Sequence, residues 1–118
     1  MSHTFAYQDI DGKVREYDVH DLWIHTAHTP VIDINLELVI GCINDYVNSF
    51  TPDDWDRVLN ADLSYPIIIN DISGIVDGCH RTVKAVFLGY TSISAKRLVE
   101  FPTPNRVWKD WMDYDLNY

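Results

Sequence analysis

The chain has 118 residues, of which 47% are hydrophobic, and its 18 acidic side chains against nine Lys and Arg give a net charge of −9. This length and apolar content predict one compact domain that buries a core. The acidic excess disfavours binding to the phosphate backbone of duplex DNA, and the lack of a long apolar run disfavours contact with a membrane.

The first thirty residues predict a hairpin followed by a short helix. Residues Phe5–Ile10 and Lys13–Val19 flank Asp11-Gly12, a dipeptide that favours a two-residue hairpin turn. Asp18 stands where a side-chain cap is expected, and the helix is expected to close before Pro30.

The histidines and cysteines predict neither a metal site nor a disulfide. His20, His25 and His28 are five and three residues apart, so they do not fall on one helical face. Cys42 and Cys79 fit neither a disulfide framework nor the spacing of a zinc site. With no recognisable secretory signal, a reducing, cytoplasmic setting is expected.

The next segment predicts a strand, an ambiguous stretch and a helix. Val31–Leu38 alternates apolar and polar residues, as in a strand with one solvent face, on which Asp33 and Glu37 lie. Ile40–Phe50 has no decisive pattern. Thr51-Pro52-Asp53-Asp54 predicts a helix start, because it offers a cap, a proline at the first position and two acids.

The stretch Tyr65–Leu98 contains the clearest succession of elements. In order, the pattern predicts a buried strand at 67–69, a tight turn at 70–74, a short strand at 75–76, a helix from residue 82 that ends at Gly89, and a strand at 92–98. The segment from Asp77 to Arg81 therefore lies where a strand ends and a helix begins.

This junction, Asp77-Gly78-Cys79-His80-Arg81, predicts an anion site. The first turn of a helix leaves amide groups unpaired and carries a partial positive charge. Gly78 admits a ligand close to the backbone, and a thiol, an imidazole and a guanidinium follow it, so phosphate is the expected ligand. The alternative is structural, with Asp77 as a cap, Gly78 as a turn residue and Arg81 as a solvated side chain.

Across these residues the chain resembles the ParB/sulfiredoxin-like superfamily. The similarity rests on Pro66-Ile-Ile-Ile69, a turn, Gly74-Ile-Val-Asp-Gly-Cys-His-Arg81 and a helix that ends in Gly89. The Asp-Gly-x-His-Arg form is closest to the ParB-like branch, which includes nucleotide-binding partition proteins, small-molecule kinases and phage and bacterial proteins of uncharacterised function. The resemblance implies an α+β fold, with a small mixed sheet flanked by helices.

The resemblance also implies roles for single residues. In sulfiredoxins the cysteine of Gly-Cys-His-Arg attacks and the His-Arg pair holds ATP phosphates. Asp77 stands where sulfiredoxins have glycine, which disfavours that chemistry, and the arginine-rich box of the partition proteins is absent, so DNA segregation is not implied. The early strand borders the nucleotide pocket in this superfamily. Asp33 and Glu37 are therefore candidates for a general base, or else they only line the solvent face.

The C-terminal segment predicts an extended stretch and a last helix. Phe101–Pro104 contains two prolines and breaks helices, and Asn105 is expected to cap the helix that follows. The aromatic side chains here favour a core or dimer seam, with base stacking or partner binding as the alternative. These aromatic residues are Trp108, Trp111, Tyr114 and Tyr118.

The predicted function is nucleotide or phosphate binding, with phosphotransfer or hydrolysis of ATP, CTP or another nucleoside triphosphate as the reaction. Arg81 would neutralise the developing phosphoryl charge, His80 would donate to a phosphate oxygen, and Asp77 would hold Mg²⁺ or the acceptor. Cys79 is a further catalytic candidate, and Gly78, Cys79 and Lys84 complete the expected binding residues. The alternative is a non-catalytic interaction protein that presents an acidic or aromatic face to a host protein. Because the resemblance includes phage proteins, it makes a phage-encoded protein one expectation.

Charge separates the two functions. An acidic enzyme must gather its cations around a triphosphate, so two or three cations are expected to border the Asp77–Arg81 turn. An interaction protein would scatter them and expose the C-terminal aromatic residues. The cations in question are Arg81, Lys84, Lys96 and Arg97.

Overall fold

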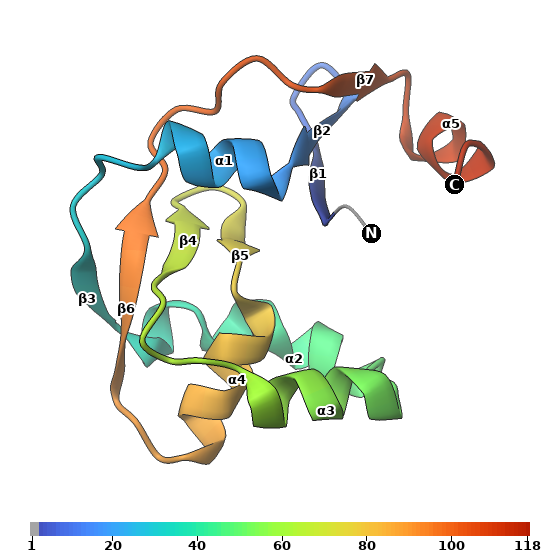
Figure 1. Cartoon of the computed structure of the whole chain (residues 1–118). Helices are drawn as coiled ribbons and strands as arrows, with labels where there is room; N and C mark the ends of the chain where they lie inside the picture. Colours follow the sequence, from blue (N-terminus) through green and yellow to red (C-terminus); the bar gives the residue numbers. More distant parts are fainter. Residues whose placement is uncertain (1–2) are drawn as a thin grey trace. The chain divides into compact units, whose positions relative to one another are not determined.

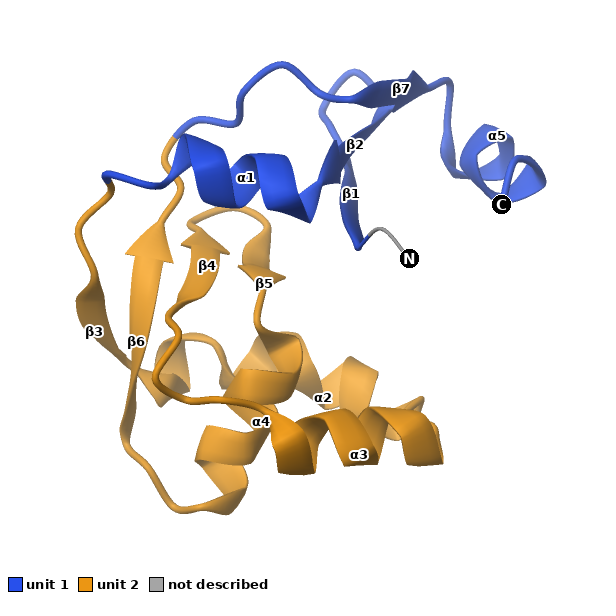
Figure 2. Cartoon of the chain, viewed as in Figure 1, with its two compact units in different colours: residues 1–28, 100–118 blue, residues 29–99 orange. Residues whose placement is uncertain are grey.

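A computed structural model describes residues 3–118, and their mixture of helices and sheets makes the chain an α+β protein (Figure 1). The chain divides into two compact units, shown in Figure 2: unit 1 combines 1–28 with 100–118, and unit 2 comprises 29–99. Unit 2 contains the whole stretch Tyr65–Leu98, for which the sequence predicts the clearest succession of elements. Within residues 3–118, no helix has the length and apolar character needed to cross a membrane.

Unit 1 contains a three-stranded antiparallel sheet in the order β1-β2-β7. The predicted hairpin is confirmed, with β1 at Thr4–Gln8 and β2 at Val14–Asp18. Its loop is longer than two residues, because the Asp9 amide donates to the Lys13 carbonyl over 2.9 Å. The third strand, β7 at Arg106–Trp108, occupies residues that the sequence assigns to a helix, so that prediction was wrong.

The two predicted helix caps of unit 1 serve another purpose. Helix α1, Val19–His25, follows Asp18, but the Asp18 carboxylate receives a hydrogen bond from Arg106 at 2.6 Å and caps nothing. The Asn105 side chain accepts from the Asp18 amide at 2.8 Å instead of capping a helix. Both residues therefore join β2 to the β7 segment. The last helix, α5 at Trp111–Leu116, is capped by Asp110.

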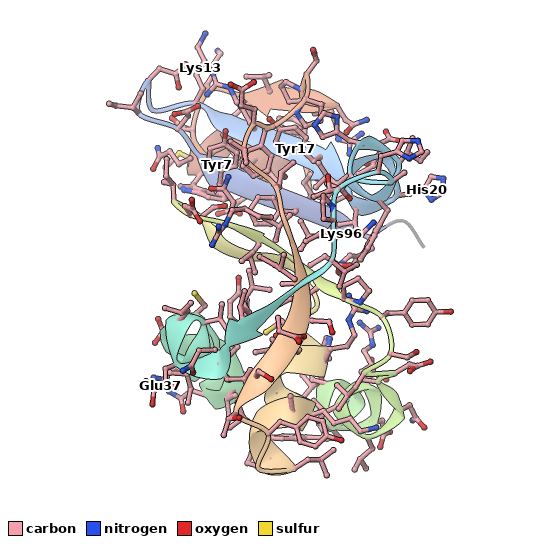
Figure 3. All side chains as sticks on the ribbon, turned by 90° about the vertical axis from the view of Figure 1, so that its left-hand side faces the viewer. Tyr7, Lys13, Tyr17, His20, Glu37 and Lys96 are labelled. Carbon is pink, nitrogen blue, oxygen red and sulfur yellow. The ribbon has the colours of Figure 1, made fainter. Side chains whose placement is uncertain are left out.

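A fully buried carboxylate, Glu16, organises the C-terminal part of unit 1. Glu16 accepts hydrogen bonds from Arg106 Nε at 2.5 Å, Trp108 Nε1 at 3.2 Å and the Tyr118 hydroxyl at 2.6 and 2.7 Å. Burial alone would raise the pKa of Glu16, but these bonds hold its pKa below the ordinary value. Elsewhere in unit 1, Tyr7 and Tyr17 (Figure 3) stack with centroids 6.3 Å apart.

Unit 2 contains a mixed four-stranded sheet in the order β3-β6-β4-β5, in which only the β4–β6 pair is parallel. The strands are β3 at Ile32–Asn35, β4 at Ile67–Asn70, β5 at Gly74–Asp77 and β6 at Ser92–Arg97. Strand β3 is shorter than predicted, because the Asn35 side chain accepts from the Glu37 amide and starts the 3₁₀ turn η1, Leu36–Leu38.

Three helices complete unit 2: α2 at Ile40–Asn48, α3 at Pro52–Asn60 and α4 at Cys79–Phe87. The predicted start of α3 is confirmed, with a capping box between Thr51 and Asp54. Helix α4 begins three residues earlier than its apolar spacing suggests and closes before Gly89, whose φ of +80° suits a helix C-terminus. Buried side chains of the sheet and of α4 form one core cluster that includes Ile67, Ile69, Ala85, Ile93 and Ala95.

Candidate functional site

The structure confirms that the Asp77–Arg81 segment joins a strand to a helix. Strand β5 ends at Asp77, Gly78 turns the chain at φ +104°, and α4 begins at Cys79. A Cβ atom on Gly78 would lie 2.4 Å from Ile67 Cγ2. The space that a side chain at Gly78 would occupy is thus filled by the first residue of β4.

The amide groups in the first turn of α4 nevertheless come before the first hydrogen bond of the helix. The first helical hydrogen bond runs from the Thr82 amide to the Gly78 carbonyl over 2.9 Å. The amides of Cys79, His80 and Arg81 precede that bond, and Gly78 has no side chain that could cap them. This end of α4 therefore retains the donors and the dipole that attract an anion.

Arg81 lies along this turn in an ion pair with Asp77. Its Nη2 atom is 3.2 Å from Asp77 Oδ2, and the two side chains are 20% and 14% exposed. The Arg81 Nε atom is buried and, among the described residues, has no hydrogen-bond partner. A buried donor without a partner is costly, so the guanidinium has capacity for another acceptor.

His80 is held on the other side of the turn by a residue that the sequence did not assign to the site. His80 Nε2 lies 3.1 Å from Asp54 Oδ1, and the imidazole stacks on the Phe50 ring at 5.5 Å. Hydrogen bonds from the Thr51 amide, from His80 and from the Thr51 hydroxyl lower the pKa of Asp54 to about 2. The capping-box pattern gives Asp54 a local role in α3, but nothing in it shows the contact with His80, 26 residues away.

The Cys79 thiol does not have the properties of an activated nucleophile. A helix N-terminus beside His80 and Arg81 predicts a depressed pKa. Burial, together with the nearby Asp54 carboxylate and the Cys42 thiol, instead raises the pKa of Cys79 to about 11. Cys79 packs against the apolar cluster of Ile43, Val58 and Val83, so the expected activation is wrong and its environment is that of a core residue.

Two of the other cations, Lys84 and Arg97, bind other parts of unit 2. Lys84 donates to the carbonyls of Leu59 and Ala61 at 2.9 and 2.8 Å, and therefore caps the end of α3. Arg97 forms an ion pair with Asp71 at 3.2 Å. In the sheet, Lys96 of β6 pairs with Ile68 of β4, and Ile68 pairs on its other side with Asp77 of β5. Of the expected cluster, Arg81 forms an ion pair at the turn, whereas Lys84 and Arg97 bind other parts of unit 2.

The early acidic residues and the C-terminal aromatics lie outside this turn. Asp33 accepts a hydrogen bond from Ser94 at 3.4 Å, and Glu37, labelled in Figure 3, is exposed on η1. The C-terminal aromatics belong to unit 1 and are partly exposed: Trp111 by 39% and Tyr118 by 68%.

Within residues 3–118, no group of three His, Cys, Asp or Glu side chains is arranged to hold a metal ion. Comparison of the chain with family models, with curated proteins and with solved structures finds no match.

Proposed function

We propose that the N-terminal turn of α4 binds the phosphate of a nucleotide. The observation that carries the proposal is the combination of three first-turn amides with a buried Arg81 Nε that has no partner among the described residues. An arginine presents planar donors that suit phosphate, and a helix N-terminus adds backbone donors and a favourable dipole. The resemblance to the ParB-like branch supports the same assignment.

The Asp77 carboxylate makes Mg²⁺ part of this proposal. In the ligand-free chain Asp77 neutralises Arg81 over 3.2 Å, and a phosphate would have to compete with it. Mg²⁺ is commonly bound by one or two carboxylates together with substrate phosphates. Bound at Asp77, Mg²⁺ would release Arg81 for the phosphate. It would also add a cation next to Arg81, in a protein whose net charge is −9.

The corresponding enzyme would transfer or hydrolyse a phosphoryl group of a nucleoside triphosphate such as ATP or CTP. Arg81 neutralises charge on the phosphoryl oxygens, and His80, oriented by Asp54, donates to a phosphate oxygen. Cys79 takes no part in this scheme, because its thiol is packed and protonated near neutral pH.

Calorimetric titration with ATP, CTP and GTP, with and without Mg²⁺, tests the proposal. Arg81→Ala should weaken nucleotide binding about tenfold to a hundredfold, the loss typical of a hydrogen bond to a charged group. Arg57→Ala is the matched control, because Arg57 forms an ion pair of the same i,i+4 type with Asp53 on α3 and should leave the affinity unchanged. Equal affinities of the wild type and Arg81→Ala, with both folded by circular dichroism, would refute the assignment.

A second candidate function is binding to another protein, and a specific observation favours it. Helix α5 of unit 1 presents Met112 and Leu116 to solvent, with exposed fractions of 72% and 80%. Exposed apolar side chains grouped on one element often mark an interaction surface. Failure of every nucleotide to bind, together with binding of a partner that Leu116→Ser abolishes, would favour this function.

A further inference from the structure

Unit 2 has an apolar groove between α2 and α4, away from the turn at the start of α4. Its volume is about 380 Å³, and its lining is mainly apolar, with two asparagines from α2. The apolar lining residues are Ile40, Ile43, Val47, Val83, Val86 and Phe87.

The groove has a buried floor and an exposed rim. Ile43 and Val83 are only 4% and 1% exposed, whereas Ile40 and Phe87 on the rim are 40% and 65% exposed. The Phe87 ring leans on Trp55 of α3, with centroids 5.6 Å apart, which supports it beside the groove. A large aromatic side chain exposed at the edge of an apolar groove offers a partner apolar area to bury.

The charges around the groove indicate what it binds. Helix α2, which forms one wall, carries Asp45 as its one charged residue and no Lys or Arg. On the other wall, the Lys84 ammonium is taken up by carbonyl groups of α3 and Arg81 by Asp77. A second copy of this chain would also carry a net charge of −9, so self-association is opposed by repulsion and a cationic partner is favoured.

We propose that this groove binds an amphipathic helix from another protein, with aliphatic side chains on one face and Lys or Arg flanking them. Two helices form the walls, and a groove of this kind accepts residues at i, i+3, i+4 and i+7 of a docked helix. The aliphatic face would cover Ile40 and Phe87, and the basic flanks would face a protein of net charge −9 whose α2 wall carries no Lys or Arg. This inference goes beyond nucleotide binding, because it uses none of the residues of the α4 turn.

The test uses the full chain and three fluorescent helical peptides of equal length. The first has a Leu/Ile face with Lys flanks, the second has the same apolar face with Glu flanks, and the third has Lys flanks with the apolar face replaced by Gln. Fluorescence anisotropy gives the affinities, and NMR shifts of the labelled protein locate the binding surface. Phe87→Ser is the groove variant. Leu59→Ser, at a position on α3 that is 71% exposed and outside the groove lining, is the control.

The proposal expects the Lys-flanked apolar peptide to bind at least tenfold more tightly than either of the others. It also expects the largest shifts at Ile40, Val47 and Phe87, and a further tenfold loss in Phe87→Ser but not in Leu59→Ser. Equal binding of the Gln-faced peptide, or shifts centred on α5, would overturn the groove assignment. Equal binding of the Glu-flanked peptide would overturn the charge argument. A dimer in sedimentation that Phe87→Ser dissociates would overturn it too, because the occupant would then be a second copy.

Discussion

Replacing Gly78 with alanine should destabilise unit 2 by more than its backbone conformation alone explains. A non-glycine residue in the left-handed region costs about 1–2 kcal/mol. In addition, the new Cβ would lie 2.4 Å from Ile67 Cγ2 and 2.8 Å from Ile67 Cβ. Overpacking of a well-filled core costs about 1–3 kcal/mol, so the expected loss is about 2–5 kcal/mol in total.

Gly89→Ala is the matched control, because Gly89 also has a positive φ, +80°, lies in the same unit and has no heavy atom within 4 Å of its Cβ position. It should lose only the backbone part, about 1–2 kcal/mol. Hydrogen exchange of β4 amides in increasing urea measures the opening free energy of unit 2 directly.

The same comparison separates packing from ligand access as the reason for Gly78. Ile67→Ala in the Gly78→Ala background should be less harmful than the sum of the two single changes, because the clash disappears with the side chain. Equal losses for Gly78→Ala and Gly89→Ala would refute the packing explanation. Ligand access would then be the better reason for the glycine, provided that Gly78→Ala also binds nucleotide more weakly.

Two further predictions concern groups with shifted pKa values. The pKa of Cys79 is raised to about 11. In a Cys42→Ser background, alkylation of Cys79 by iodoacetamide should therefore be slow at pH 7 and accelerate towards pH 11. Separately, Cys79→Ser should retain nucleotide binding. Fast alkylation at pH 7 would contradict the core assignment. Glu16→Gln should lower the unfolding free energy of unit 1 by about 1.5–3 kcal/mol, the range for hydrogen bonds to a charged group, whereas Glu100→Gln at an exposed position should not. Since the folded pKa of Glu16 is depressed, its stabilisation is present above the unfolded pKa and is lost as pH falls through the folded value. The difference in unfolding free energy between wild type and Glu16→Gln should therefore be full at pH 7 and disappear as the pH is lowered past the folded pKa of Glu16.

Elements with local signals could be predicted from the sequence. The capping box of Thr51 and Asp54 fixes the start of α3 from four consecutive residues. Ile67–Asn70 is apolar enough to indicate a buried strand without knowledge of its neighbours. The strand-to-helix junction at Gly78 follows from the change of spacing around it, and glycine at this point agrees with the observed positive φ.

Features that depend on distant residues could not be predicted in this way. Asp18 and Asn105 are good helix caps by type, yet they bond to partners almost ninety residues away. Strand β7 is only three residues long and is defined by its pairing with β2. Similarly, the sequence places three reactive side chains after Gly78. It does not show that Asp54 contacts His80 or that Ile67 packs against Gly78, and both contacts depend on the fold.

The assembly of unit 1 from both ends of the chain has a consequence for the order of folding. Its sheet pairs Glu16 with Arg106, 90 residues later, so β2 must wait until Arg106 has left the ribosome. Unit 2 is continuous and can fold first. Once folded, it pairs Ile32 with Ala95, which holds its entry and exit side by side. The remaining loop between β2 and β7 is then effectively several times shorter, a saving of about 1 kcal/mol in closure entropy. Changes that unfold unit 2 should therefore slow the closure of the unit 1 sheet, although they alter none of its strands.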